Sequence, residues 1–167
     1  MALPPVPKEG SEPSANPPAN GRGQPVLLTL DWARRNAAIS GLADAPIRWI
    51  AEDALKFVKR ELKRGSRYDA VMLDPPSYGH GPHGEVWRLS KHLPQLLSLC
   101  VELTAGRPRL MLLTCHTPGY DAASLRAMVV EAFGMGTSED VVARPLTIRA
   151  IDGRKMPGGV VVRWVGR

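Results

Sequence analysis

The chain has 167 residues, of which 44% are apolar, and it carries a formal net charge of +6, so its size and composition are those of one globular domain with its own core. It contains no apolar run long enough to cross a bilayer, no signal-peptide pattern, and two cysteines without metal-ligand spacing, which argues against a membrane, secreted or zinc-binding protein. We therefore expect a cytoplasmic protein without a membrane partner, and the positive charge favours a polyanionic one.

The first segment differs in composition from the rest of the chain. Residues 1–25 are rich in Pro, Gly, Ser and Asn, and their few charges cancel. Such a segment cannot bury a core, so we expect it to be disordered. The folded domain is then expected over residues 26–167, which carry the whole positive excess.

From residue 26 onward, predicted strands alternate with predicted helices, which implies an α/β fold with a parallel sheet. Pro94 is expected in the first turn of its helix, where a missing N–H costs little. In the first half of the chain we predict a short strand at Val26–Leu30, a helix capped by Asp31 that runs to Ser40 and stops at Gly41, a strand at Ile47–Ile50, a helix capped by Asp53 and a strand at Tyr68–Leu73. A glycine-rich loop over Gly79–Gly84 follows. In the second half we predict a helix over Leu93–Leu103, a strand at Leu110–Leu113, a helix over Ser124–Phe133 and a closing hairpin of Val141–Ile151 with Val160–Val165.

Asp74, Pro75 and Pro76 follow the predicted Tyr68–Leu73 strand directly. The prolines fix φ and carry no N–H, and a following proline pushes Asp74 towards an extended conformation. Ligands of parallel sheets bind at the carboxyl ends of the strands. The sequence therefore predicts a stiff turn that presents a carboxylate and carbonyl oxygens to an amino group. The alternative is an ordinary strand-ending turn with a solvated Asp.

Four segments carry a family resemblance. Asp74-Pro75-Pro76-Ser77-Tyr78 resembles motif IV of class I S-adenosylmethionine-dependent methyltransferases, and Trp32–Asn36, Ser40–Leu42 and Trp49–Ala54 resemble the second helix and motif III of the same fold. From Trp32 to its end, the chain is similar to the bacterial 23S ribosomal RNA methyltransferases that include cytosine-5 and guanine-N7 enzymes. The resemblance implies a Rossmann-like sheet and methyl transfer from S-adenosylmethionine to a nucleic-acid base, with ribosomal RNA as the expected substrate.

The same resemblance implies roles for individual residues. Asp53 is expected to accept a hydrogen bond from the adenine amino group of the donor while the Ala54 N–H meets a ring nitrogen; a plain N-cap is the alternative for Asp53. Asp74 is expected to hold the methionine end of the donor or the target base, with Pro75 and Pro76 shaping the wall. Tyr78 is expected to stack on a flipped base or to cover the donor; the alternative is that it packs under its loop.

Cys115 has two interpretations. Leu113-Thr114-Cys115 resembles the context in which cytosine-5 enzymes place a nucleophilic thiolate, which attacks the pyrimidine ring. His116, however, stands where a small hydroxyl residue is usual. A buried structural cysteine is the favoured alternative. Cys100 lies on the apolar face of its predicted helix and is expected in the core.

A dense basic run follows Asp53, with Glu61 as its single acid. Such a run can bind RNA phosphates, with Lys59 and Lys63 as the expected contacts; the alternative is a solvated helix face. The run comprises Lys56, Lys59, Arg60, Lys63, Arg64 and Arg67, and Arg144, Arg149, Arg154 and Lys155 form a weaker second set.

Some parts of the family pattern have no counterpart before Trp32: the first strand, its glycine-rich turn and the acid that binds the donor ribose. We therefore expect a domain that is incomplete on its N-terminal side and binds S-adenosylmethionine weakly or not at all. The alternative function is a catalytically inactive, basic RNA- or protein-binding remnant of such an enzyme. The methylated atom and the oligomeric state stay open.

Overall fold

The computed structural model describes residues 24–80, 85–106, 108–134 and 140–166, with side chains from residue 29 onward. The chain divides into two compact units, Met1–Ala51 and Glu52–Arg167. Most of the segment expected to be disordered, residues 1–23, lies outside the described residues.

The first unit contains one helix, α1 (Gln24–Ile39), in its described part. It ends as predicted at Gly41, whose φ of 74° suits a helix-terminating glycine. The strand predicted at Val26–Leu30 is wrong, because these residues are helical, and Asp31 lies inside α1, where it pairs with Arg34 at 2.8 Å. A short apolar run does not distinguish a strand from a buried helix.

The strand predicted at Ile47–Ile50 is also wrong. The segment is assigned to no strand, and no strand pairing includes it. A strand needs ladder hydrogen bonds to a neighbour, and its own apolar residues do not supply them.

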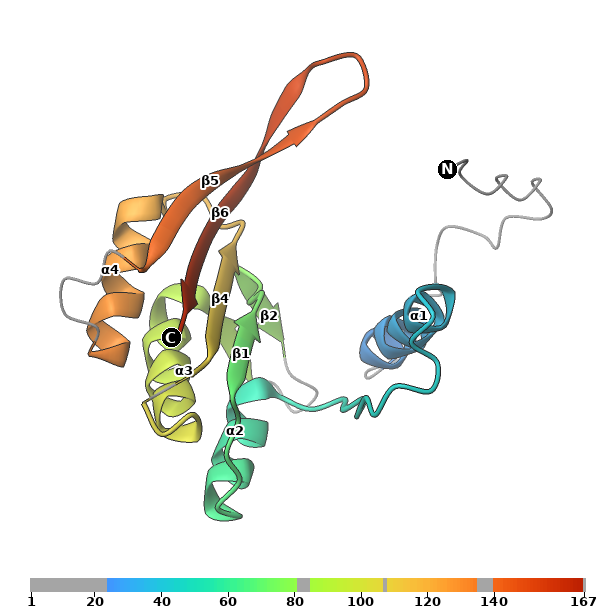
Figure 1. Cartoon of the computed structure of the whole chain (residues 1–167), viewed down its shortest axis with the longest axis vertical. Coiled ribbons are helices and arrows are strands. Elements are labelled where there is room, and N and C mark those ends of the chain that lie inside the picture. The colour runs from blue at the N-terminus through green and yellow to red at the C-terminus, as the bar shows by residue number, and fades with distance from the viewer. Residues whose placement is uncertain (1–23, 81–84, 107, 135–139, 167) are drawn as a thin grey trace. The chain divides into compact units, whose positions relative to one another are not determined.

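The second unit is built on a sheet with strand order β1-β4-β6-β5 (Figure 1). Strands β1 (Ala70–Leu73) and β4 (Leu110–Cys115) pair in parallel, with Leu73 opposite Leu113. Strand β6 (Lys155–Val165) pairs antiparallel with both β4 and β5 (Val142–Arg149). The predicted parallel pair and the closing hairpin are thus confirmed, although β6 begins at Lys155, five residues before the predicted Val160.

Three helices accompany this sheet: α2 (Ala54–Lys63), α3 (Leu89–Leu103) and α4 (Ala122–Phe133). All three were predicted, but α3 begins four residues earlier than expected. Pro94 therefore lies in the second turn of α3, and its predicted place in the first turn is wrong. Burial explains the earlier start, because Leu89 is only 2% exposed and continues the apolar face of the helix.

Residues around the predicted glycine-rich loop form a small antiparallel ladder. Strand β2 (Tyr78–His80) pairs with β3 (Val86–Arg88), so Gly79 and His80 belong to a strand instead of a loop. The rest of that predicted loop, residues 81–84, lies outside the described residues.

The core fills one face of the sheet. Side chains alternate along β4, so Met111, Leu113 and Cys115 are buried while the residues between them are partly exposed. The buried face packs with α3 and α4 in one cluster that includes Cys100. Burial raises the pKa of the Cys100 thiol to about 11, and its predicted place in the core is confirmed.

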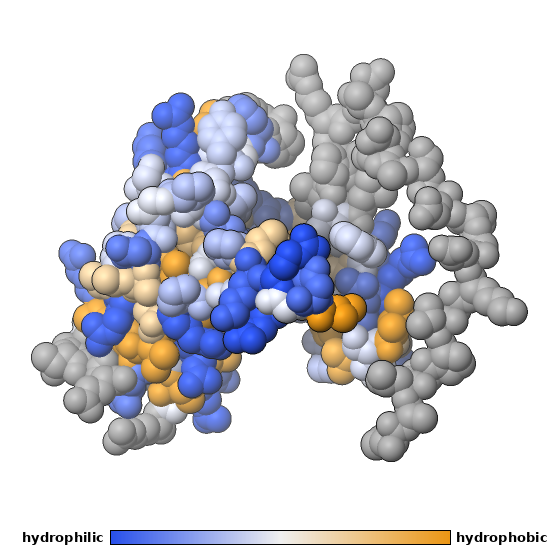
Figure 2. All heavy atoms as spheres, turned by 90° about the horizontal axis from the view of Figure 1, so that it is seen from above, coloured by the Kyte–Doolittle hydropathy of each residue, from blue (hydrophilic) through white to orange (hydrophobic). Residues whose placement is uncertain are grey.

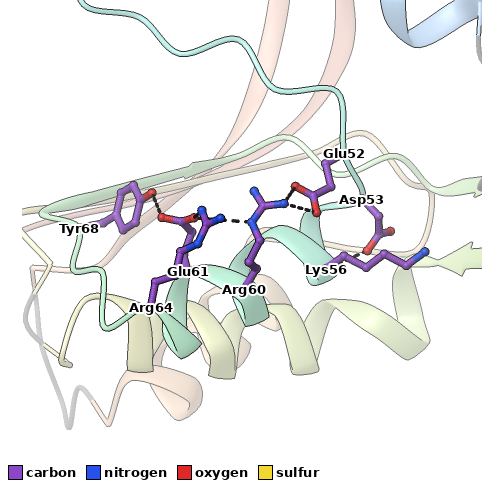
Figure 3. A network of polar contacts seen from close by, with 7 residues as sticks. All are labelled: Glu52, Asp53, Lys56, Arg60, Glu61, Arg64 and Tyr68. Atoms are coloured by element: carbon purple, nitrogen blue, oxygen red, sulfur yellow. Dashed lines mark hydrogen bonds and ion pairs between the residues drawn. The ribbon is translucent and has the colours of Figure 1, made fainter.

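A buried carboxylate ties α2 to the segment that leads into β1 (Figure 3). Glu61 is only 3% exposed, and it accepts hydrogen bonds from the Tyr68 hydroxyl at 2.9 Å and from Arg64 Nη1 at 3.0 Å. Arg60 lies between Glu61 and Glu52, with Nη1 2.6 Å from Glu52 Oε1. The hydrogen bond from Tyr68 is the main cause that lowers the pKa of Glu61.

This geometry predicts an acid-sensitive contribution to stability. The pKa of Glu61 is lower in the folded chain, so its ionised form stabilises the fold above the ordinary value near 4.3, and this contribution is lost as the pH falls through the folded value. Glu61→Gln is expected to lower the melting temperature at pH 7 and to flatten its fall in acid. Thermal unfolding followed by circular dichroism from pH 7 to pH 3 measures both.

Glu102→Gln is the matched control, because Glu102 is an exposed glutamate on α3. It should leave the melting temperature near the wild-type value throughout. If both variants gave the same pH curve, the Glu61 network would have no role in acid unfolding.

Candidate functional site

The Asp-Pro-Pro turn stands at the carboxyl edge of the parallel pair. Asp74 follows β1, and its Oδ1 accepts a hydrogen bond from Thr114 Oγ1 on β4 at 2.6 Å. His116 Nε2 lies 3.3 Å from the same oxygen. Two neighbouring parallel strands thus bring three polar side chains to one edge, the place where ligands of such sheets bind.

Only one oxygen of this carboxylate is engaged. Within the described residues, Asp74 Oδ1 takes the contacts from Thr114 and His116, and Oδ2 has no hydrogen-bond partner. The Asp74 side chain is 68% exposed. The arrangement therefore fixes the orientation of the carboxylate and leaves Oδ2 able to accept a hydrogen bond from a ligand.

The turn itself is held by groups that the sequence analysis missed. The Trp87 indole N–H donates to the Pro76 carbonyl oxygen at 2.7 Å, and the Leu89 N–H donates to the Ser77 carbonyl at 3.1 Å. Ser77 Oγ lies 2.7 Å from Thr117 Oγ1 beyond the end of β4. Only a general rule could have pointed to Trp87, namely that a partly buried Trp side chain usually finds an acceptor for its N–H.

Asp53 caps α2, as predicted: its side chain accepts from the Lys56 N–H at 2.9 Å. A cavity of about 230 Å³ opens beside it. Trp87 and His92 form a stacked pair in its lining, with ring centroids 5.2 Å apart and planes 24° apart. The volume lies below the usual range for whole ligands, so the cavity suits one part of a ligand, such as a planar ring. Its lining comprises Asp53, Leu55, Lys56, Lys59, Glu85, Val86, Trp87 and His92.

Tyr78 lies on β2 and is 52% exposed. Its hydroxyl is 3.0 Å from His80 Nε2, and the two rings meet edge to face. The alternative in which Tyr78 packs under its loop involves residues 81–84, which lie outside the described residues. Stacking on a base stays a prediction.

Cys115 is turned away from Asp74. Its side chain is 1% exposed and belongs to the helix-covered face of β4, whereas Thr114 lies on the opposite face. The structure thus brings Asp74, Thr114 and His116 together at the edge and leaves Cys115 in the core.

Three of the six residues in the basic run pair with acids. Arg60 pairs with Glu52, Arg64 with Glu61, and Lys56 with Glu85 at 2.5 Å. The hydrogen bond to Glu85 raises the pKa of Lys56. Lys59 and Lys63 are exposed, and the described part of the chain gives neither of them an ion pair, so they are the cations of α2 available to a phosphate.

Other kinds of site find no support in the described residues. They contain no group of His, Cys, Asp or Glu side chains placed to hold a metal ion. None of their helices combines the length and the apolarity that a membrane span requires.

Comparison with known proteins supplies the family context. The structure matches that of a SAM-dependent methyltransferase from Agrobacterium tumefaciens with a TM-score of 0.72 and 37% identity, covering 83% of this chain and 46% of that one. The chain resembles class I S-adenosylmethionine-dependent methyltransferases. Its Rossmann-like α/β fold with a C-terminal antiparallel hairpin is the predicted one. No family model matches the sequence.

Two of the curated relatives, both named as ribosomal RNA methyltransferases, show how much of the chain is matched. Ribosomal RNA large subunit methyltransferase I of Aeromonas salmonicida is 26% identical over 123 residues, which are 74% of this chain and 30% of the relative. Ribosomal RNA large subunit methyltransferase K of Neisseria meningitidis is 22% identical over 129 residues, 77% of this chain and 32% of the relative. The chain thus spans about a third of the length of these relatives.

A glycine positions the end of β4 next to β6. Gly159 has a φ of 94°, and a Cβ added there would clash with the Cys115 carbonyl oxygen and come within 2.9 Å of His116 Nδ1. Only a residue without a side chain lets β6 pass this close to His116.

Gly159→Ala is therefore expected to destabilise the fold and to displace His116 from Asp74. The positive φ alone costs about 1–2 kcal/mol, and the steric clash adds roughly another 1–3 kcal/mol. Urea unfolding measures the loss, and the imidazole NMR signals of His116 report its displacement.

Gly153→Ala is the matched control. Gly153 has a φ of 85°, but a Cβ there meets no atom within 4 Å, so this variant bears the backbone cost alone. Equal losses of stability in the two variants would show that the close approach at Gly159 is unimportant.

Proposed function

We propose that this chain supplies part of the site of an S-adenosylmethionine-dependent methyltransferase that acts on a base of ribosomal RNA. The observation that carries the proposal is the oriented Asp74 carboxylate at the carboxyl edge of β1 and β4. The likeness to the Agrobacterium tumefaciens structure supports the donor, and the names of the curated relatives support the substrate.

The cavity beside Asp53 fits the adenine end of the donor. Ala54 is the first residue of α2, so its N–H has no acceptor within the helix and can donate to a ring nitrogen. The Asp53 carboxylate can accept from the adenine amino group while it still caps the helix. When bound, the donor supplies the methyl group from its sulfonium, and the chain aligns donor and acceptor.

The target base lies against the Asp-Pro-Pro turn in this proposal. Asp74 Oδ2 accepts from an amino group of the base, and Pro75 and Pro76 form a wall without N–H groups. Tyr78 is sufficiently exposed to stack on a flipped base. Lys59 and Lys63, both exposed on α2, hold phosphates of the RNA.

Asp74→Asn tests the proposal. The substitution keeps the size of the side chain but removes the charge and half of its acceptor capacity. A charge-assisted hydrogen bond is worth about 1.5–3 kcal/mol, so its loss in the transition state slows methyl transfer on the order of ten- to a hundredfold. Because weak donor binding is expected, transfer of a tritiated methyl group to ribosomal RNA is measured at a high concentration of S-adenosylmethionine.

Asp69→Asn is the control, since the Asp69 side chain is 87% exposed and its Oδ1 lies 4.0 Å from Arg109 Nε. It should leave the rate unchanged, and both variants should keep the wild-type melting temperature. An Asp74→Asn protein with full turnover and a lowered melting temperature would make Asp74 a structural turn residue. A wild-type chain that binds RNA without any methyl transfer would support the inactive remnant instead.

We propose that Cys115 is a packing residue. It lies among apolar side chains on the covered face of the sheet and does not reach the edge where Asp74 stands. Cys115→Ala is expected to lower the free energy of unfolding on the order of 1 kcal/mol and to retain methyl transfer. Abolished transfer in a stably folded Cys115→Ala protein would restore the nucleophile interpretation. Covalent trapping on RNA containing 5-fluorocytosine would do the same.

A further inference from the structure

The β5–β6 hairpin extends past the rest of its sheet. Strand β4 pairs with β6 only over Val160–Val165, whereas β5 pairs with β6 down to Arg149 opposite Lys155. Residues 146–158, called the hairpin arm below, therefore form a two-stranded ribbon that projects from the unit (Figure 1). A two-stranded ribbon without a third strand is only marginally stable by itself. The stability of the fold therefore does not explain why these residues project from the sheet.

The arm leaves the sheet at the candidate site. Its last residues lead into Gly159 and Val160, and Val160 lies opposite Cys115, the residue between Thr114 and His116. The arm thus begins at the same edge that carries Asp74. Any large substrate whose reacting part reaches Asp74 would also pass the arm.

One face of the arm is basic. Arg149 and Lys155 are direct cross-strand partners, so their side chains share a face. Like charges directly opposite one another destabilise a two-stranded ribbon. In the described residues no acid pairs with either of them, because the nearby Asp152 binds Arg154 at 2.6 Å. Three cations and one acid leave the arm with a net charge of +2.

The other face of the arm is apolar and exposed. Ile148 and Met156 are cross-strand partners that are 55% and 58% exposed, and Ile151 at the turn is fully exposed. Figure 2 looks at the molecule from the end to which the arm projects and shows hydrophilic residues beside hydrophobic ones there. The opposed cations, the net charge and the place of the arm all favour an anionic occupant.

We propose that the hairpin arm binds the phosphate backbone of the RNA next to the target base, with Arg149 and Lys155 as the phosphate contacts. A phosphate between the two cations turns their repulsion into two favourable charge-assisted contacts. The contact positions the substrate without reading its sequence. The inference rests on the proposed function and adds a second surface that holds the RNA, besides Lys59 and Lys63.

The test uses the full chain and a fluorescently labelled RNA hairpin, with binding followed by fluorescence anisotropy between about 0.05 and 0.2 M salt. The double variant Arg149→Gln/Lys155→Gln is expected to raise Kd on the order of tenfold and to reduce the slope of log K against log salt by about 1.5. Its melting temperature should equal or exceed that of the wild type, because a repulsive pair is removed.

Arg109→Gln/Arg163→Gln is the matched control. Both arginines are exposed and lie outside the arm. Their substitution lowers the net charge by the same amount as the arm variant does. This control should change Kd less than the arm variant by several fold. Equal weakening in both double variants would overturn the arm proposal and leave RNA binding to diffuse charge.

Two further outcomes would also overturn the arm proposal. A wild-type chain that binds no RNA even at low salt would remove the proposed RNA substrate together with the arm. Self-association in sedimentation that is lost with Ile148→Ser would identify a second copy of the chain as the occupant. In contrast, an arm variant with unchanged RNA affinity would refute the arm alone and leave the proposed function standing.

Discussion

The parallel pairing of β1 with β4 is the constraint on which the site depends. Leu73 lies opposite Leu113, so the next residues along the two strands, Asp74 and Thr114, emerge at the same level. A shift of one residue would place the side chains of one strand on the wrong face. The buried side chains of Val71 and Met111 prevent that shift, because both must face the helices. Core packing thus sets the geometry of the polar edge.

Around this edge, rigidity comes from the backbone of the turn and from the groups that hydrogen-bond to it. The prolines limit the backbone of the turn, the Trp87 indole holds its Pro76 carbonyl, and Thr114 holds one carboxylate oxygen of Asp74. A site whose acceptor is already oriented loses little entropy when a base arrives. The same edge continues into the β5–β6 hairpin through Gly159, so Asp74 and the strands that extend beyond it share one support.

Local sequence patterns correctly predicted the structural features that are set by residues close together in the sequence. The cap at Asp53, the buried Cys100 and the strand at Leu110–Leu113 follow from spacing and composition alone. The strand at Val26–Leu30 failed because a short apolar run also fits a helix, and the one at Ile47–Ile50 failed because a strand requires a partner. The contacts of Thr114 with Asp74 and of His116 with Asp74 were missed because they join residues about 40 positions apart. Only the register of two strands brings such residues together.

The strand order of the sheet has a consequence for how the chain acquires its fold. Among the sheet strands, β6 comes last in the chain, yet it lies between β4 and β5. The edge of β4 that faces β6 therefore has no partner until residues 160–165 are in place. Folding of the sheet is dominated by contacts between distant residues, which are slow to form. During synthesis, the apolar strand β4 stays open to wrong partners until β6 has been made, so this interval is when a chaperone would matter most.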